Sequence, residues 1–251
     1  MEDKELLQKR FIELARRSYN SGIFTFTDFL GLSEQAAFDG IKREIYGIPY
    51  EAFGGAEGAE RVMIRFGSAE DLGYELPFPI VCIKAEPVSQ KFADKLTHRD
   101  FLGALLNLGI ERSTLGDIPI LDNVGYIFAS EDIAPFIISE LTRVKHTEMR
   151  LSTVDELPEG ELYKTERRRV QISGERLDAV IARVFSLSRE EAQSLFAKRL
   201  VFVSGRLCES TSYTPKESEK VSVRGKGRFI YRGIVGNTRK GKLNVEVDVF
   251  K

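Results

Sequence analysis

Residues 173–208, SGERLDAVIARVFSLSREEAQSLFAKRLVFVSGRLC, predict two short helices followed by a β-hairpin. We expect Ser173 to cap the first helix, whose apolar residues recur at helical spacing: Leu177, Val180, Ile181 and Val184. Ser188 and Glu191 form the pattern of a capping box at the start of the second helix. Two apolar strands then flank the turn dipeptide Ser204-Gly205.

The chain on either side of this segment predicts further strands. Residues 220–224 form one strand, which ends at the glycine-rich segment 225–228. Residues 243–249 alternate Leu or Val with polar residues, so we expect a last strand with one buried face. Before the segment, the turn-forming sequence Pro158-Glu-Gly160 and the run Arg167-Arg168-Arg169 indicate a domain boundary between residues 160 and 161.

The C-terminal third of the chain is strongly basic. Residues 167–251 carry 19 Lys and Arg against 9 Asp and Glu, a net charge of +10 that the total of −1 conceals, and residues 1–166 carry −11. Such a segment is typical of a polyanion binder, because neutralised phosphates release counterions and supply sequence-independent affinity. The alternative is a well-charged surface without a ligand.

Residues 77–160 predict the element order β-α-β-β-α-β. We expect a strand at 80–83, a helix capped by Thr97 with Asp100 and closed by Gly109, a hairpin around Asp122-Asn123, and a last strand near 147–151. The second helix is expected to begin at a Ser130 cap and to carry Ile133, Phe136, Ile137, Leu141 and Val144. This order is that of ferredoxin-like and many RNA-recognition domains. Tyr126 and Phe128 alternate on the expected sheet, where packing is favoured over base stacking.

The N-terminal residues predict a small helix-rich α/β domain. Helices are expected at 4–19 and from Ser33 with Glu34 to Ile45, followed by a loop at 54–58 and a strand at 61–66. The predicted fold class is therefore α+β, with domains at 1–76, 77–160 and 161–251, the last with a C-terminal β extension.

The C-terminal pattern resembles a known module. Four segments are similar, in their order and spacing, to the S-four RNA-binding domain: Ser173–Asp178, Leu187–Arg189, Val201-x-Val203-x-Gly205 and Val221–Phe229. Arg199 departs from this family, which usually has Gly at that position; a left-handed backbone there would cost a non-Gly residue of the order of 1 kcal/mol. Ser204 replaces the usual Asn.

The rest of the chain narrows the resemblance to the YlmH family of bacterial proteins. The segment HRDFLGALLNLGIER at 98–112, followed by Gly116-Asp-Ile118, carries it, and residues 24–30 and 54–61 are similar too. The resemblance implies a non-enzymatic RNA-binding protein that associates with the large ribosomal subunit and peptidyl-tRNA in ribosome-associated quality control, with some members linked to cell division. The expected partners are therefore rRNA and tRNA, with no cofactor.

The basic side chains that we expect to contact RNA follow from helix geometry. Arg183 follows Arg176 by seven positions, which places both on one stripe of a helix. Arg189 opens the next helix, where its positive charge opposes the helix dipole and has no stabilising role. Further RNA-binding candidates at the end of that helix and on the following turns are Lys198, Arg199, Arg206, Arg224, Lys226 and Arg228. The alternative is that Arg176 or Arg183 pairs with Glu175 or Asp178.

Three patterns could carry chemistry. Arg176-Leu177-Asp178 is similar to a motif of pseudouridine synthases, but Asp178 falls in a first helical turn, where capping or orienting Arg176 is favoured. Gly236-x-x-x-x-Gly241-Lys242 lacks the Ser or Thr of a phosphate-binding loop and precedes a strand, so a basic hairpin turn at 237–240 is favoured over nucleotide hydrolysis. His98 and His146 are the only histidines, and a helix-start hydrogen bond is favoured for His98.

We therefore predict no enzymatic activity and no metal site. Two alternatives stay open: an RNA-modifying enzyme whose catalytic part is 1–166, and a protein-interaction adaptor linked to cell division. The N-terminus is charged and has no apolar signal segment, and nowhere do 18 apolar residues run together, so we expect neither secretion nor a membrane span. The two widely spaced cysteines fit a reducing cytoplasm. We expect a cytoplasmic monomer.

Overall fold

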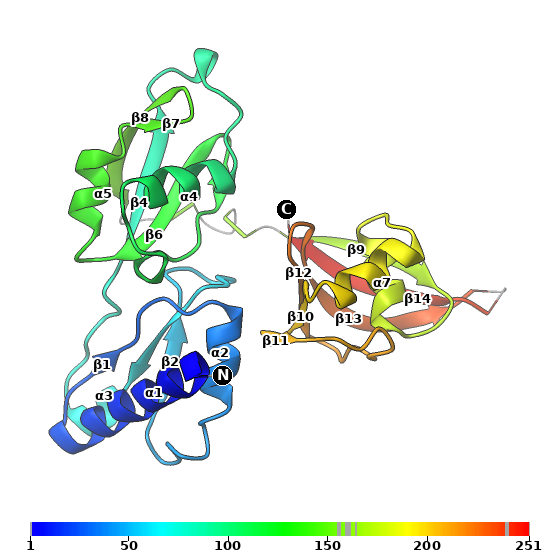
Figure 1. The fold of residues 1–251 in the computed structure, drawn as a ribbon, viewed down its shortest axis with the longest axis horizontal. Helices are drawn as coiled ribbons and strands as arrows, with labels where there is room; N and C mark the ends of the chain where they lie inside the picture. Colours follow the sequence, from blue (N-terminus) through cyan, green and yellow to red (C-terminus); the bar gives the residue numbers. More distant parts are fainter. Residues whose placement is uncertain (1, 155–156, 159–161, 164, 239–240, 251) are drawn as a thin grey trace. The chain divides into compact units, whose positions relative to one another are not determined.

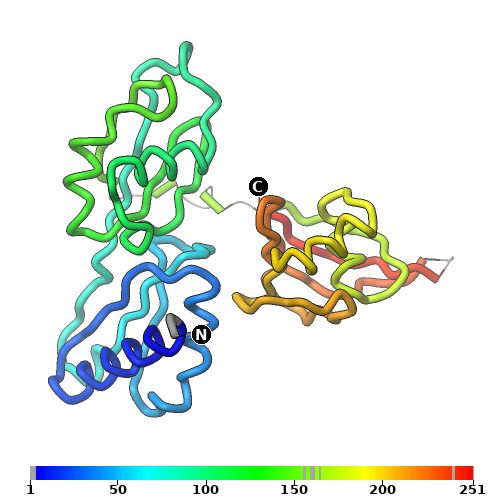
Figure 2. Tube along the Cα trace, viewed as in Figure 1, coloured from blue at the N-terminus to red at the C-terminus, as the bar shows by residue number. Residues whose placement is uncertain are grey.

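The chain forms two compact units of mixed α and β structure. A computed structural model describes residues 2–154, 157–158, 162–163, 165–238 and 241–250, and it divides into an N-terminal unit, Met1–Tyr163, and a C-terminal unit, Lys164–Lys251 (Figures 1 and 2). The predicted boundary between 160 and 161 lies outside the described residues, and the division into three domains stays a prediction. None of the helices in the described ranges has the length and apolar character needed to cross a membrane.

The first half of the N-terminal unit packs helices against a small sheet. Its elements are α1 (Glu2–Ser21), β1 (Thr25–Phe26), α2 (Leu32–Asp39), β2 (Tyr50–Phe53), β3 (Met63–Phe66) and α3 (Ala69–Leu72), with strand order β1-β3-β2. The helix expected over 4–19 is confirmed. The helix expected from 33 to 45 ends at Asp39, because Gly40 follows and the backbone continues in turns that bond Ile41 N–H to Phe38 O. Ile41 and Ile45 are still buried, which explains the misleading helical spacing.

The second half of this unit contains a five-stranded sheet with helices on one face. Its elements are β4 (Ile80–Pro87), η1 (Gln90–Phe92), α4 (His98–Asn107), η2 (Arg112–Thr114), β5 (Ile120–Leu121), β6 (Val124–Ser130), α5 (Ala134–Glu140), β7 (Arg143–Val144) and β8 (Thr147–Val154). The strand order is β5-β6-β4-β8-β7. The element order follows the predicted β-α-β-β-α-β pattern, with β7 as an additional short edge strand.

The helix cap and the hairpin turn predicted from neighbouring residues are present in this half, except for the cap at Ser130. Thr97 and Asp100 form the predicted capping box, and Asp122 and Asn123 have φ angles of 49° and 67°, as a tight hairpin turn requires. The prediction of a Ser130 cap is wrong: Ser130 ends β6, its hydroxyl is buried without a hydrogen-bond partner among the residues that the structure describes, and α5 starts at Ala134. Val144, expected on that helix, lies in β7.

On the side away from α4 and α5, the part of the sheet face that carries Cys82, Tyr126 and Phe128 is covered by the first half of the unit, whereas Arg150 and Ser152 of β8 are exposed. Phe29, Met63, Cys82, Tyr126 and Phe128 form one buried cluster there. Tyr126 is 8% exposed and Phe128 is 1% exposed, so the expectation that they pack rather than stack on bases is confirmed. The approach is close: a Cβ atom on Gly55, at φ +92°, would lie 2.3 Å from Cδ1 of Phe128. This sheet therefore offers no open aromatic face to RNA.

The C-terminal unit is a six-stranded antiparallel sheet with two helices on one side. Its elements are β9 (Thr165–Ile172), α6 (Leu177–Val184), α7 (Arg189–Ala197), β10 (Val201–Val203), β11 (Arg206–Leu207), β12 (Lys220–Val223), β13 (Gly227–Asn237) and β14 (Leu243–Phe250). The order is β11-β10-β12-β13-β14-β9. The core between helices and sheet includes Leu177, Ile181, Phe196, Val221, Phe229 and Val247. We call the side with the helices the helix side and the other the outer face.

Most predicted local features of this unit are confirmed. Ser188 Oγ accepts from Glu191 N–H at 3.2 Å while the Glu191 carboxylate accepts from Ser188 N–H at 2.8 Å, which is the predicted capping box. Arg199 has φ +58°, the left-handed conformation inferred from its position, and Ser204 and Gly205 make the hairpin turn at +45° and +80°.

Two predictions for this unit need comment. The Ser173 cap is wrong, because Arg176 is the residue that caps α6 and it has extended backbone at φ −114°, ψ 139°. The strands β13 and β14 do form a hairpin, with Asn237 opposite Leu243. Of the basic turn predicted between them, Arg239 and Lys240 lie outside the described residues.

Candidate nucleic-acid interface

Asp178 organises the start of both helices in the C-terminal unit. Its side chain is fully buried, and its two oxygens accept from Arg176 Nε at 3.1 Å and Nη2 at 3.0 Å. Gln193 of α7 donates to the same carboxylate at 3.0 Å, and Arg189 Nε lies 3.7 Å away. Burial acts to raise the pKa of Asp178, but the hydrogen bonds from Gln193 and Arg176 outweigh it, so the pKa is lowered. The predicted orientation of Arg176 by Asp178 is therefore present.

The predicted arginine stripe is wrong in its geometry. Arg176 precedes α6 in extended backbone, so the helical angle that placed it beside Arg183 does not apply. Arg183 lies exposed in the last turn of α6 and, within the described part of the chain, forms no ion pair. The alternative of carboxylate pairing thus describes Arg176, and Arg183 stays available for a ligand.

The other predicted RNA-binding residues divide between the two sides of the sheet. On the helix side, Lys198 caps the end of α7 in an exposed position, Arg199 lies 3.6 Å from Glu209, and Arg206 stands on the edge strand β11. Lys226 is exposed in the turn before β13. Arg224 and Arg228 belong to the outer face, where they lie over the rings of Phe202 and Phe250. The structure therefore does not bring the nine residues into one strip.

Four further cations on the outer face escaped the sequence analysis: Arg167, Arg169, Lys220 and Arg232. The side chains of directly opposite residues in antiparallel strands lie on the same side of the sheet. The pairs Asp248–Arg167, Glu246–Arg169 and Ile230–Asp248 therefore lie together on the outer face. In the strand 165–172 only Ile172 is buried and Arg168 is exposed between Arg167 and Arg169, so the strand register was needed to assign these arginines to a side.

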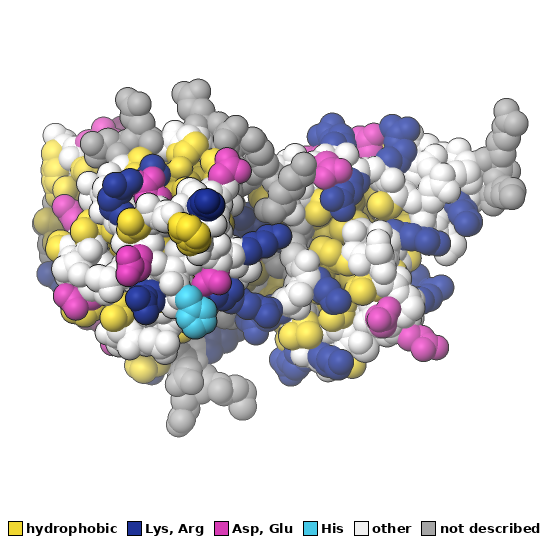
Figure 3. All heavy atoms as spheres, turned by 90° about the horizontal axis from the view of Figure 1, so that it is seen from above, with side chains coloured by type: hydrophobic (Ala, Val, Ile, Leu, Met, Phe, Trp, Pro, Cys, Tyr) yellow, Lys and Arg dark blue, Asp and Glu magenta, His cyan; other side chains and the backbone are white. Residues whose placement is uncertain are grey.

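Carboxylates hold three of these arginines in place. Asp248 on β14 lies between Arg167 of β9, at 2.9 Å from Nε, and Arg232 of β13, at 2.7 Å from Nε. Glu246 binds Arg169 at 2.8 Å. The hydrogen bond from Arg167 is the main reason that the pKa of Asp248 is lowered. Figure 3 shows that Lys and Arg outnumber Asp and Glu on the visible face of this unit, with hydrophobic side chains between them.

In the N-terminal unit, the motifs of the YlmH resemblance meet in a structural clamp. The Arg61 guanidinium donates to the carbonyl oxygens of Leu115 at 2.8 Å, Phe29 at 2.7 Å and Arg112 at 3.0 Å. Asp117 accepts from the backbone N–H groups of Glu60 at 2.6 Å and Arg61 at 3.2 Å. Burial lowers the pKa of Arg112 to about 10. This clamp joins the two halves of the unit, a role that the sequence analysis missed.

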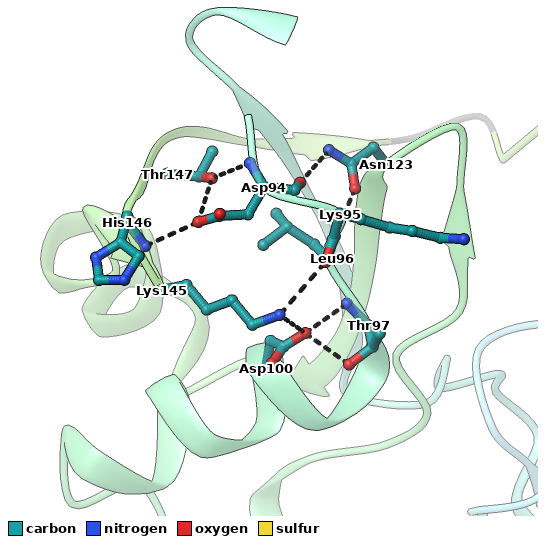
Figure 4. Close-up of polar contacts among 9 residues, drawn as sticks. All are labelled: Asp94, Lys95, Leu96, Thr97, Asp100, Asn123, Lys145, His146 and Thr147. Carbon is teal, nitrogen blue, oxygen red and sulfur yellow. Dashed lines mark hydrogen bonds and ion pairs between the residues drawn. The ribbon is translucent and has the colours of Figure 1, made fainter. Parts of the chain in front are cut away.

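A second polar cluster fastens three loops at one end of the five-stranded sheet (Figure 4). Asp94 accepts from the His146 backbone N–H at 3.1 Å and from Thr147 Oγ1 at 3.3 Å, while Asn123 Nδ2 donates to Asp94 O at 2.9 Å. Lys145 Nζ lies 2.9 Å from Asp100 Oδ2. The His146 ring points away from the carboxylates in Figure 4. The cluster therefore has a structural role, and the described residues contain no group of three or more His, Cys, Asp or Glu side chains able to hold a metal ion.

Comparison with known proteins gives three similarities. Residues 78–157 match the family described as "Putative RNA-binding domain in YlmH". The chain is 29% identical over 255 residues to the ribosome-associated protein quality control protein P2 of Bacillus subtilis (strain 168), covering 97% of this chain and 91% of that protein. The solved structure of cell division protein ylmH from Streptococcus pneumoniae is 20% identical, with a TM-score of 0.48, over 61% of this chain and 91% of that one.

Proposed function

We propose that this chain is a member of the YlmH family that binds structured ribosomal RNA or tRNA through its C-terminal unit and has no enzymatic activity of its own. The observation that carries the proposal is the net charge of +10 on residues 167–251, which occupy a unit with its own hydrophobic core. The exposed cations of that unit supply phosphate contacts, which position a protein on RNA without reading its sequence.

The proposed setting is the large ribosomal subunit carrying peptidyl-tRNA. It is supported by the relative whose name places it in ribosome-associated quality control and by the RNA-binding description of the matched domain. Because one sheet face of that domain carries α4 and α5 and the other buries Tyr126 and Phe128, its contribution to RNA binding would come from loops, edges and the exposed part of that second face around Arg150. A cytoplasmic location and a monomeric state complete the proposal.

The proposed absence of catalysis is supported by the surroundings of Asp178 and Lys242, which belong to the two motifs that could carry chemistry. Asp178 is buried and held by Arg176 and Gln193, which leaves it no access to a substrate. Lys242 is followed by Leu243, the first residue of β14, so no helix N-terminus is present there to bind phosphates.

Sedimentation of cell extract through a sucrose gradient tests the ribosomal proposal. We expect the protein to comigrate with large subunits and to move to the top of the gradient after ribonuclease treatment. Retention of the same protein partners after ribonuclease, without ribosomal comigration, would favour the adaptor alternative.

A further inference from the structure

The outer face of the C-terminal sheet gathers cations from strands that are far apart in sequence. Of the described residues on this face, six are basic and two carry carboxylates, Glu246 and Asp248. The basic residues are Arg167, Arg169, Lys220, Arg224, Arg228 and Arg232. Within the described part of this unit, both helices, α6 and α7, pack on the opposite side of the sheet. Its charge excess is thus separate from the helix side.

Aromatic rings on the outer face hold its cations. The Arg224 guanidinium lies 4.5 Å from the ring centroid of Phe202, and that of Arg228 lies 4.2 Å from the centroid of Phe250. Lys220 Nζ lies 5.8 Å from the Phe250 centroid. A guanidinium over a ring keeps its N–H groups available at its edge, in the planar fork that matches phosphate. Within the described residues, the Arg224 side chain has no hydrogen bond or ion pair.

The carboxylates of this face position arginines without cancelling the excess charge. Asp248 is shared by Arg167 and Arg232, so this group of three retains a charge of +1. On the helix side, Arg176 and Arg189 likewise share Asp178, and Arg199 lies near Glu209. The six cations and two carboxylates described on the outer face leave that face with a net charge of +4.

We propose that the outer face is a second RNA-binding surface, distinct from the helix side, along which the phosphate backbone of an RNA strand lies. The inference rests on the proposed RNA-binding function. The cations stand on or beside β12, β13 and β9, and β14, which carries the two carboxylates, lies between β13 and β9. At about 4.8 Å between strands, the surface spans about 14 Å across these four strands.

The double variant Arg224→Gln with Arg228→Gln tests the surface in the full-length protein. Its matched control is Arg16→Gln with Arg17→Gln, which removes the same charge from exposed positions on α1. Binding of a fluorescein-labelled RNA stem-loop is followed by fluorescence anisotropy between 50 and 200 mM KCl. Loss of two phosphate contacts lowers the log-log salt slope by about 1.4 to 1.8 and the affinity at 0.1 M salt by about 25- to 60-fold. The control keeps the wild-type slope.

A second pair of variants tests the aromatic support without changing charge. Phe202→Leu removes the ring under Arg224 and is expected to weaken RNA binding several-fold, whereas Phe202→Tyr keeps the ring and the affinity. Phe202 is 6% exposed, so thermal melting accompanies these measurements. If Phe202→Leu does not fold, the glutamine pair alone decides.

The outcomes separate the inference from the function on which it rests. If wild-type protein binds the stem-loop and the Arg224 and Arg228 variant binds like its α1 control, the outer face is not an RNA surface. Competition by poly-glutamate as effective as that by RNA of equal charge would likewise overturn it, in favour of an acidic protein. No binding of RNA by the wild-type protein would instead remove the proposed function itself.

Discussion

The buried carboxylate of Asp178 accepts two hydrogen bonds from Arg176, two residues earlier, at 3.1 and 3.0 Å. This pair occupies an Arg-Leu-Asp motif that invites a catalytic interpretation. Because Gln193 of α7 also donates to Asp178, the carboxylate joins the two helices.

Replacing Asp178 therefore affects stability. Asp178→Asn leaves Arg176 without its charged partner, so we expect the free energy of unfolding of the C-terminal unit to fall by about 1–3 kcal/mol. Urea denaturation measures this change. Glu190→Gln, at an exposed position on α7, is the matched control and should be neutral. An unchanged unfolding midpoint in Asp178→Asn would contradict the structural role.

Acid should destabilise the C-terminal unit through its two buried aspartates. The pKa values of Asp178 and Asp248 are both lowered in the folded protein. Their stabilising contribution is therefore complete above the unfolded value of about 3.9 and is lost as the pH falls through the lower folded values. Melting temperatures between pH 7 and pH 2.5 test this. Asp248→Asn should show a shallower acid loss than wild type, and an identical loss would disprove the contribution of Asp248.

On the helix side, substitution of Arg183 should affect RNA binding, whereas substitution of Arg176 should affect stability. Arg183→Ala removes an exposed charge that has no ion-pair partner among the described residues, so we expect weaker RNA binding, a log-log salt slope lower by about 0.7 to 0.9, and no change in melting temperature. Arg176→Ala should lower the melting temperature, because it removes the partner of Asp178. Arg189, 3.7 Å from Asp178, is expected to show both effects. A salt slope unaffected by Arg183→Ala would exclude Arg183 from the interface.

The two units should differ sharply in RNA affinity when separated. A fragment of residues 164–251 is expected to retain most of the affinity and a fragment of 1–163 little, because the positive charge is concentrated in the former. Filter binding of both fragments at one salt concentration measures this, with circular dichroism to show that each is folded. Equal affinities would contradict the proposal.

Phe128 should matter for folding and not for RNA. Phe128→Ala removes a buried ring from the cluster between the two halves of the N-terminal unit, so we expect a loss of about 3–5 kcal/mol in unfolding free energy. Phe136→Ala, which removes a ring that is 42% exposed on α5, is the control and should cost far less. RNA affinity of folded Phe128→Leu protein should equal that of wild type, and a selective loss of RNA binding would mean that the sheet face takes part.

The sequence by itself determined the features that depend on near neighbours in the chain. The capping boxes at Thr97 and Ser188, the Asp122-Asn123 and Ser204-Gly205 turns and the alternation in β14 are all as predicted. Each rests on groups within about one turn of chain, so the hydrogen bonds and backbone angles that define it need no distant partner. The segregation of charge into the C-terminal third is likewise a property of the sequence alone.

Only the tertiary structure decided which side chains meet. The Ser130 and Ser173 caps failed because strand pairing and extended backbone moved the helix starts to Ala134 and Leu177. The cover over Phe128 and the assembly of Arg167, Lys220 and Arg232 on one face depend on residues tens of positions apart. Strand register assigns those residues to a side, and a shift of one residue would reverse every assignment. Register is set by the packing of the whole sheet, which no local segment contains.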